Sequence, residues 1–187
     1  QAASGTNRLA RECDLGDAQA CSELGNHHYN GDDVPLDLSR AAQLYQKSCD
    51  GSHFQGCRNL GILVKNGEGV PQDHVRAVQL FKMACEGGNQ PGCYELGLAH
   101  YWGRGVKEDH DASVATFRKA CDAGEMGSCR ELGLAHARGT GAELDHQRAA
   151  ELYRQACDGG DDSGCYELGI VYYFGTGVEV DYTRSAE

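Results

Sequence analysis

The sequence predicts an all-α repeat protein, and the positions of its cysteines are the first reason. Among 187 residues, 10 cysteines form pairs whose members are eight residues apart, and each pair recurs after 36 residues. A fixed period of this size is typical of stacked supersecondary units. The second reason is that glycine-rich loops alternate with segments whose small and aromatic residues recur at helical spacing. We therefore expect an α-solenoid built from 36-residue helix-turn-helix repeats.

Alignment on the cysteines divides the chain into repeats that we expect to form a single domain over residues 1–187. They are a half unit 1–20, full repeats 21–56, 57–92, 93–128 and 129–164, and a partial repeat 165–187. In each, we expect a first helix from the cysteine through a Leu-Gly pair, a Gly-x-Gly loop, and a second helix that an aspartate caps. The first loop has Asp33 in place of its second glycine, a departure that leaves room for a different loop conformation.

The eight-residue interval shows that bonded cysteines cannot share one helix. Eight helical residues span about 12 Å, whereas a disulfide needs Cα atoms within about 7 Å. The chain must therefore reverse between them, and the intervals contain glycine turns suited to this. The simplest pairing joins nearest neighbours: Cys13–Cys21, Cys49–Cys57, Cys85–Cys93, Cys121–Cys129 and Cys157–Cys165. The sequence leaves other pairings open.

Reduced thiols that bind metal are the competing interpretation of the cysteines. The chain contains no C-x-x-C and no H-x-x-x-H pair, which disfavours a zinc site. Ten cysteines in register instead indicate an oxidising compartment, so we expect a secreted or periplasmic protein without a bound metal ion.

Charge and composition exclude several classes of partner. The net charge of −11 argues against nucleic acid and anionic membranes, which need a basic surface. A membrane-spanning helix needs about eighteen or more apolar residues in a row, and no apolar run in this chain approaches that length. We therefore expect no membrane insertion. No basic region followed by an apolar stretch stands at Gln1, so we expect that any secretion signal has been removed or is not included. The last repeat stops at Glu187 partway through its second helix. Stacking of terminal repeats between chains, a purely structural role, is therefore one functional alternative.

The residues of these repeats carry a resemblance to a known family. Leu60-Gly61, Gly67-Glu68-Gly69-Val70 and Asp73, followed by alanines and an aromatic residue, form a pattern that resembles the Sel-1-like repeat, a relative of the tetratricopeptide repeat. The cysteine pairs resemble the secreted Helicobacter cysteine-rich protein family more closely. The resemblance covers nearly the whole chain and implies a right-handed α-solenoid in which a disulfide staples each repeat junction.

The same resemblance implies an alternative function, because members of the cysteine-rich family have been described as binding penicillins and hydrolysing them slowly. The motifs of serine and zinc hydrolases are nevertheless missing: Ser-x-x-Lys, Lys-Thr-Gly, Ser-Asp-Asn, Gly-x-Ser-x-Gly and His-Glu-x-x-His. We therefore expect no enzyme, no catalytic residue and no cofactor, and we keep binding of a cell-wall or β-lactam ligand as the runner-up.

By analogy with tetratricopeptide arrays, the first helix of each repeat lines the concave side. Positions two, six, nine and ten would face this groove, and they vary between repeats while the framework stays constant, as a specificity surface does. The candidate binding residues are Arg58, Asn66, Tyr94, Leu98, Tyr101, Trp102, Arg130, Arg138, Tyr166, Tyr173 and Phe174. Aromatic residues and arginine are enriched at binding hot spots, so we expect a protein or an extended peptide as partner.

Two alternatives remain open for these positions. The first is that some of the candidates fill gaps between repeats, and the second is that Asn30 and Asn66 suit a helix end as well as a peptide backbone. The strongest patch is expected around Tyr94, Tyr101, Trp102, Arg130 and Arg138.

One acidic position also recurs near the start of the first helices. It is occupied by Glu23, Glu95, Glu131 and Glu167, and by Asn59 in one repeat. We expect these residues in the first helical turn, where the macrodipole favours negative charge. The alternative is an acidic ladder along one face of the array.

Overall fold

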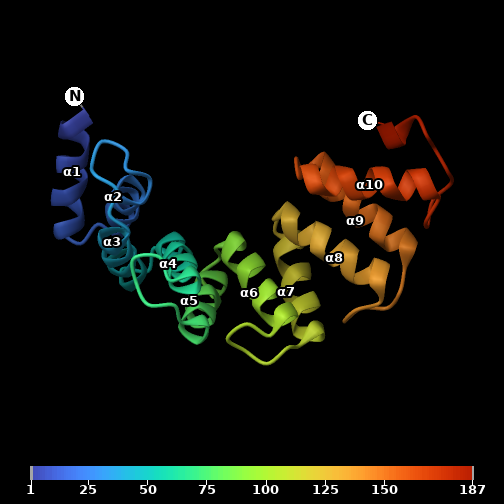
Figure 1. The fold of residues 1–187 in the computed structure, drawn as a ribbon, viewed down its shortest axis with the longest axis horizontal. Helices are drawn as coiled ribbons and strands as arrows, with labels where there is room; N and C mark the ends of the chain where they lie inside the picture. Colours follow the sequence, from blue (N-terminus) through green and yellow to red (C-terminus); the bar gives the residue numbers. More distant parts are fainter. Residues whose placement is uncertain (1, 187) are drawn as a thin grey trace. The chain divides into compact units, whose positions relative to one another are not determined.

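The computed structural model describes residues 2–186, and their regular structure consists of helices alone (Figure 1). Ten α-helices of 13 residues follow one another and a short 3₁₀ helix comes last. Their bounds are α1 Ala2–Asp14, α2 Ala18–Asn30, α3 Leu38–Asp50, α4 Phe54–Asn66, α5 His74–Glu86, α6 Gln90–Trp102, α7 His110–Asp122, α8 Met126–Arg138, α9 His146–Asp158, α10 Asp162–Phe174 and η1 Arg184–Ala186. The all-α prediction is confirmed.

The chain forms two compact units. The N-terminal unit comprises the residues up to Gly92 together with Arg104–Val106, and the C-terminal unit comprises Cys93–Gly103 and the chain from Lys107 onward. In the N-terminal unit each helix from α1 to α5 packs against the next, and α2 also contacts α4. In the C-terminal unit the same holds from α7 to α10, and α10 also contacts α8 and η1. A single repeat domain over 1–187 stays a prediction.

Aspartates cap the second helix of each pair, as the sequence predicts. The carboxylates of Asp37, Asp73, Asp109 and Asp145 accept a hydrogen bond from the backbone N–H three residues later. Asp181 does the same for Arg184 at η1. Each contact satisfies an amide that the first turn leaves without a helical partner.

The first helices begin earlier than expected, three residues before their cysteine. Acidic caps accompany this at three of the five first helices, where Asp17 accepts from Ala20 N, Glu125 from Ser128 N and Asp161 from Gly164 N. At α4 the N-cap residue His53 makes no side-chain hydrogen bond, yet the helix starts at the same place in the repeat. The recurring acidic position therefore lies in the second helical turn. The expected placement in the first turn is wrong, and with it the macrodipole explanation, because that effect falls off within one turn.

Disulfides join consecutive helices at their junctions. The predicted pairs Cys13–Cys21, Cys49–Cys57, Cys121–Cys129 and Cys157–Cys165 are confirmed, with Cα atoms 4.4 to 4.7 Å apart. Cys85 and Cys93 are disulfide-bonded as well, so all ten cysteines, which lie in the described part of the chain, are oxidised.

The core of each pair is an aromatic ring from the second helix packed on a glycine of the first. The rings of Tyr45 and Phe81 lie against Gly25 and Gly61 in the N-terminal unit, and Phe117 and Tyr153 lie against Gly97 and Gly133 in the C-terminal unit. A Cβ atom on Gly61 would be 2.5 Å from Cε1 of Phe81. The Leu-Gly pair is thus a packing requirement, because only glycine admits the ring.

The second glycine of each Gly-x-Gly loop has positive φ and touches the preceding repeat. Gly69, with φ 68°, lies against the backbone of Leu38, and Gly141, with φ 69°, lies against the carbonyl of His110. Asp33 takes the same left-handed conformation with φ 63°, so the first loop does not depart in its backbone at that residue. Aspartate is among the residues that tolerate this region.

Candidate binding surface on the first helices

A pocket of about 310 Å³ lies on the first helices of the N-terminal unit. It is lined by Asn26, Tyr29, Tyr45, Gln55, Arg58, Asn59 and Ile62, which come from α2, α3 and α4. Four of them occupy groove positions two, six and nine of their repeats. In this unit the structure therefore brings Arg58 together with variable residues of the preceding repeat.

Carboxamide side chains form a connected network along one wall of this pocket. The Tyr45 hydroxyl and Asn59 Nδ2 both donate to Asn26 Oδ1, at 2.8 and 3.3 Å. Gln55 Nε2 donates to Asn59 Oδ1 at 2.8 Å, and Asn89 Nδ2 donates to Gln55 Oε1 at 2.9 Å. Burial raises the pKa of Tyr45 to about 12, and the neighbouring Tyr29 adds to the rise. Tyr45 therefore stays protonated and remains a donor.

Arg58 differs from this network because its charge has no partner. Its Nε atom is buried without a hydrogen bond, and no ion pair joins Arg58 to a carboxylate within residues 2–186. A buried polar group without a hydrogen bond is costly, and natural proteins contain few of them. Among the described residues, the guanidinium of Arg58 therefore lies at the pocket wall without an ion pair to a carboxylate.

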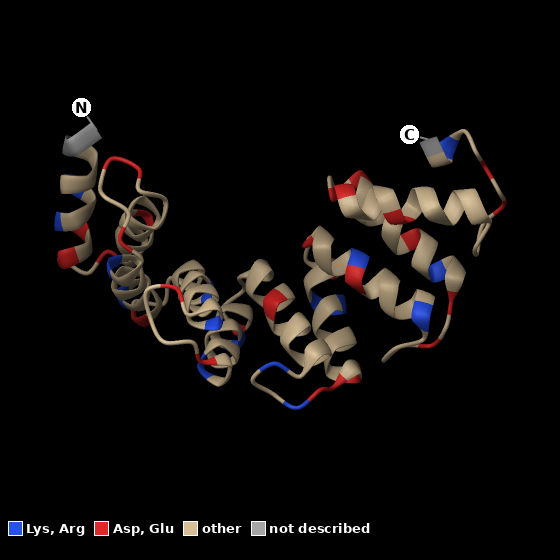
Figure 2. Ribbon diagram, viewed as in Figure 1, with Lys and Arg blue, Asp and Glu red and all other residues tan. Residues whose placement is uncertain are grey.

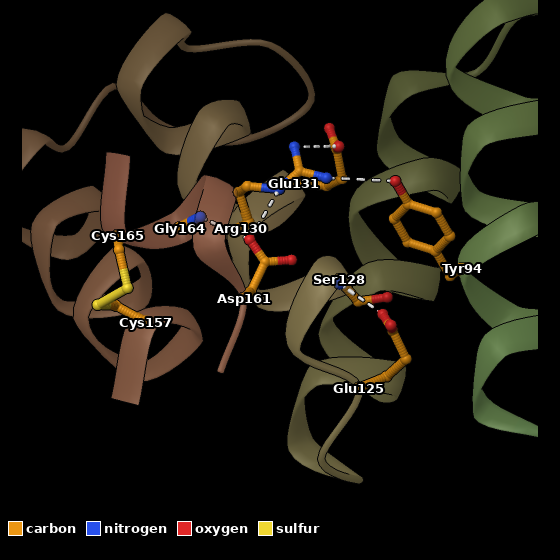
Figure 3. A network of polar contacts seen from close by, with 9 residues as sticks. All are labelled: Tyr94, Glu125, Ser128, Arg130, Glu131, Cys157, Asp161, Gly164 and Cys165. Carbon is orange, nitrogen blue, oxygen red and sulfur yellow. Dashed lines mark hydrogen bonds and ion pairs between the residues drawn. A yellow bond between two sulfur atoms is a disulfide. The ribbon is translucent and has the colours of Figure 1, made fainter. Parts of the chain in front are cut away.

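Arg130, at the same repeat position in the C-terminal unit, is held by three side chains (Figure 3). Its Nη1 lies 2.7 Å from Glu131 Oε1, its Nε lies 3.4 Å from Asp161 Oδ1, and its Nη2 donates to the Tyr94 hydroxyl at 3.3 Å. The side chains of Arg130, Glu131 and Asp161 are less than a fifth exposed.

This network also sets the protonation of its members. Burial opposes the charged form of Arg130, but Glu131, Tyr94 and Asp161 outweigh it, so the pKa of Arg130 is raised. The pKa of Tyr94 is raised as well, mainly by burial and then by the charge of Glu131. Arg130 thus remains charged, and its charge is balanced within the chain.

The other candidates of the C-terminal unit fall into two groups. Tyr94 and Leu98 are half-buried and pack against the cluster around Phe117, so they fill space between helices. Tyr101 packs edge-on against Trp102, with ring centroids 4.8 Å apart, and its ring also lies 5.0 Å from that of His110. Trp102 is 58% exposed.

The remaining candidates lie at helix ends and on α10. Tyr166, Tyr173 and Phe174 are exposed and line a second pocket of about 450 Å³. Arg138 is exposed at the end of α8. Asn66 Nδ2 donates to Glu68 Oε1 at 2.9 Å, and Asn30 makes the same contact with Asp32, so both serve the helix end.

The candidate residues named from the sequence include none of the five members of the N-terminal network: Asn26, Tyr45, Gln55, Asn59 and Asn89. A signal for one of them exists, because Asn59 interrupts the recurring acidic position. The others owe their place to packing between neighbouring repeats. The candidate site is therefore more polar than the list of aromatic residues indicates.

Charged side chains of both signs are spread over the helices, with Lys and Arg beside Asp and Glu on several of them (Figure 2). Acidic residues outnumber basic ones by 28 to 17 in the full sequence. Within residues 2–186 no group of three His, Cys, Asp or Glu side chains could hold a metal ion. No helix in that range has the length and apolar character needed to cross a membrane.

Helix pairs with ring-on-glycine cores, disulfide junctions and a variable first-helix surface define an α-solenoid repeat scaffold. The Sel1 repeat family matches residues 18–53, 55–89, 90–125, 127–161 and 162–187, so the chain belongs to that family. Its resemblance to this family, stated from the sequence, is confirmed.

Solved structures agree with this assignment. The chain is similar to a Sel1 repeat protein from Oxalobacter formigenes, with a TM-score of 0.92 and 23% identity over 97% of this chain and 72% of that one. It is similar to cysteine-rich protein B of Helicobacter pylori, with a TM-score of 0.54 and 30% identity over 66% of this chain and 88% of that one.

A third solved structure covers nearly the whole chain. It is a protective antigen of uropathogenic Escherichia coli with an SLR fold, matched with a TM-score of 0.58 and 30% identity over 96% of this chain and 46% of that one. No curated protein matches the chain.

Proposed function

We propose that this protein is a secreted or periplasmic scaffold that binds a protein or an extended peptide segment on its first helices. One observation carries the proposal. In the N-terminal unit the positions that vary between repeats line a pocket, whereas the glycines, caps and cysteines that recur are used in packing. A constant framework with a variable surface is how repeat proteins build binding sites.

The exposed aromatic residues supply the contact area that such a partner needs. Trp102, Tyr166 and Phe174 are all more than half exposed on first helices. Flat rings provide large contact area at low cost in side-chain entropy, and tryptophan and tyrosine are enriched at hot spots. Nothing among residues 2–186 favours the cell-wall or β-lactam alternative, so binding of a polypeptide is the role proposed.

The disulfides support a location outside the cytoplasm. Disulfides persist in oxidising compartments and are rare in the cytosol. With all ten cysteines oxidised, the chain fits an extracytoplasmic compartment, and the periplasm or the cell exterior is the one proposed.

Selection of peptides from a random library on the oxidised protein tests the proposal. Replacing Trp102 with Ala should weaken a selected peptide by roughly 2 kcal/mol, or about thirtyfold, if the ring is a central anchor. Because Trp102 is 58% exposed, helicity and disulfide pairing should be unchanged.

Leu144 provides the matched control. It is also 58% exposed but lies in the loop before α9, outside the first-helix surface. Leu144→Ala should leave the affinity unchanged. If Trp102→Ala unfolds the protein while the surviving folded fraction still binds, the ring belongs to the core and the binding face is misplaced.

A further inference from the structure

Arg58 and Arg130 stand at the same repeat position, two 36-residue periods apart, but their surroundings differ in charge. The three partners of Arg130 are Glu131, Asp161 and Tyr94. Two periods earlier, the corresponding positions hold Asn59, Asn89 and Ser22. Both carboxylates are thus replaced by uncharged carboxamides. Asn89 has the shape of an aspartate, whereas Asn59 is one methylene shorter than a glutamate.

The replacement keeps the structural role of these positions. Asn89 Oδ1 accepts a hydrogen bond from Gly92 N at 2.9 Å, as Asp161 Oδ1 does from Gly164 N. Asn59 and Asn89 are both tied to Gln55. The cap and the helix contacts therefore survive the exchange, and what is lost is the negative charge that balances the arginine.

Within residues 2–186, the positive charge of Arg58 consequently forms no ion pair with a carboxylate. The Nε atoms of Arg58 and Arg130 are both buried without a hydrogen bond, yet only the Nε of Arg130 faces a carboxylate, at 3.4 Å. An Arg–carboxylate pair is strong because the planar guanidinium matches both carboxylate oxygens. The site at Arg58 has the same arginine but lacks the carboxylates that Glu131 and Asp161 supply at Arg130.

The third exchange concerns the space in front of the guanidinium. In the C-terminal unit the ring of Tyr94 fills this place, and it packs on Phe117 with centroids 6.0 Å apart. The N-terminal unit has the small, buried Ser22 instead, and the pocket of about 310 Å³ lies beside Arg58. Asn26 and Tyr29 add donors to its wall, and Ile62 adds an apolar contact.

We propose that this pocket is a carboxylate-binding subsite in which Arg58 pairs with the terminal or side-chain carboxylate of an extended peptide. The proposal rests on the peptide-binding function and specifies its anchor. Although the protein is acidic overall, the free guanidinium forms a local positive point that fixes the register of the ligand.

Nuclear magnetic resonance of the arginine Nε–Hε groups tests the subsite directly. The Arg58 signal is identified by its loss in Arg58→Lys. N-acetylglycine serves as the probe for a terminal carboxylate and N-acetylglutamate α-amide as the probe for an acidic side chain. N-acetylglycinamide is the uncharged control. At least one carboxylate probe should shift the Arg58 signal saturably, the amide should not, and the Arg130 signal should stay in place.

A double variant copies the surroundings of Arg130 into the N-terminal unit. Asn59→Glu with Asn89→Asp should supply the missing carboxylates and weaken binding of the carboxylate probe at least about tenfold. Gln147→Glu with Gln155→Glu is the matched control, because it adds two carboxylates at exposed positions of α9, which contributes no residue to the pocket, and it should bind as the parent does. Circular dichroism and disulfide mapping establish that each variant is folded.

Three results would overturn the subsite: no saturable shift with either carboxylate probe, an equal shift with the amide, or unchanged binding in the double variant. Peptides that bind equally well as C-terminal amides without acidic residues, and equally to Arg58→Lys, would also overturn it while the proposed peptide-binding function stands. If the carboxylate probes bind Arg58 but no peptide is selected, the subsite is supported and the peptide-binding function fails.

Discussion

Removing one disulfide measures how the repeats are held together. Cys121→Ala with Cys129→Ala deletes the bridge between α7 and α8, which closes a sequence separation of eight residues. On the chain-entropy model a loop of this length contributes about 2.5 kcal/mol. Both cysteines are buried, so loss of two sulfur atoms adds about 0.8 kcal/mol for each atom of methylene size. The free energy of unfolding should therefore fall by about 4 kcal/mol.

Urea unfolding followed by circular dichroism measures this loss, and hydrogen exchange locates it. Because a repeat contacts its neighbours only, amide protection should fall mainly in α7 and α8. Cys13→Ala with Cys21→Ala is the matched control, since its bridge spans the same separation. It should show a similar cost, with protection lost in α1 and α2. A loss below about 1 kcal/mol, or a loss of protection that is equal throughout the chain, would refute the reasoning.

Two further predictions concern the packed rings. Gly61→Ala should destabilise the fold, because displacing the Phe81 ring costs about 1–3 kcal/mol and outweighs the gain of up to about 1 kcal/mol in helix propensity. Gly5→Ala, where nothing lies within 4 Å of the new Cβ, should raise the melting temperature. If thermal unfolding shows a higher melting temperature for Gly61→Ala than for Gly5→Ala, this account is contradicted. Tyr153 has a pKa raised from 10.0 to about 12, mainly by burial and then by Glu167. The native state keeps this proton while the unfolded state releases it, so stability should fall as pH rises between these values. Tyr153→Phe should flatten that decline in urea unfolding measured at each pH, and an unchanged slope would exclude Tyr153 as its source.

Much of the fold could be predicted because the residues that each repeat needs for packing recur at the same positions of one chain. The eight-residue cysteine interval predicts a chain reversal between bonded cysteines, because helix geometry prevents them from sharing one helix. Nearest-neighbour pairing is the simplest of the pairings that the sequence leaves open. The recurring glycine before each loop reflects a contact with one ring, such as Phe81 on Gly61. Helix starts were less predictable, because caps such as Asp17 and Glu125 lie outside the motif used for alignment.

The sequence by itself determined the all-α repeat architecture, the chain reversal between bonded cysteines and the positions that vary. These properties depend on contacts between residues close in the chain or one period apart. Only the tertiary structure decided which carboxylates pair with an arginine. Arg130 and Arg58 occupy the same repeat position, yet Arg130 pairs with Glu131 and with Asp161, which the chain reaches 31 residues later. Arg58 has Asn59 and Asn89 at the equivalent positions and forms no ion pair with a carboxylate in the part of the chain that the structure describes. The charge of a site is a sum over neighbours that packing brings together, and a period in the sequence does not reveal that sum.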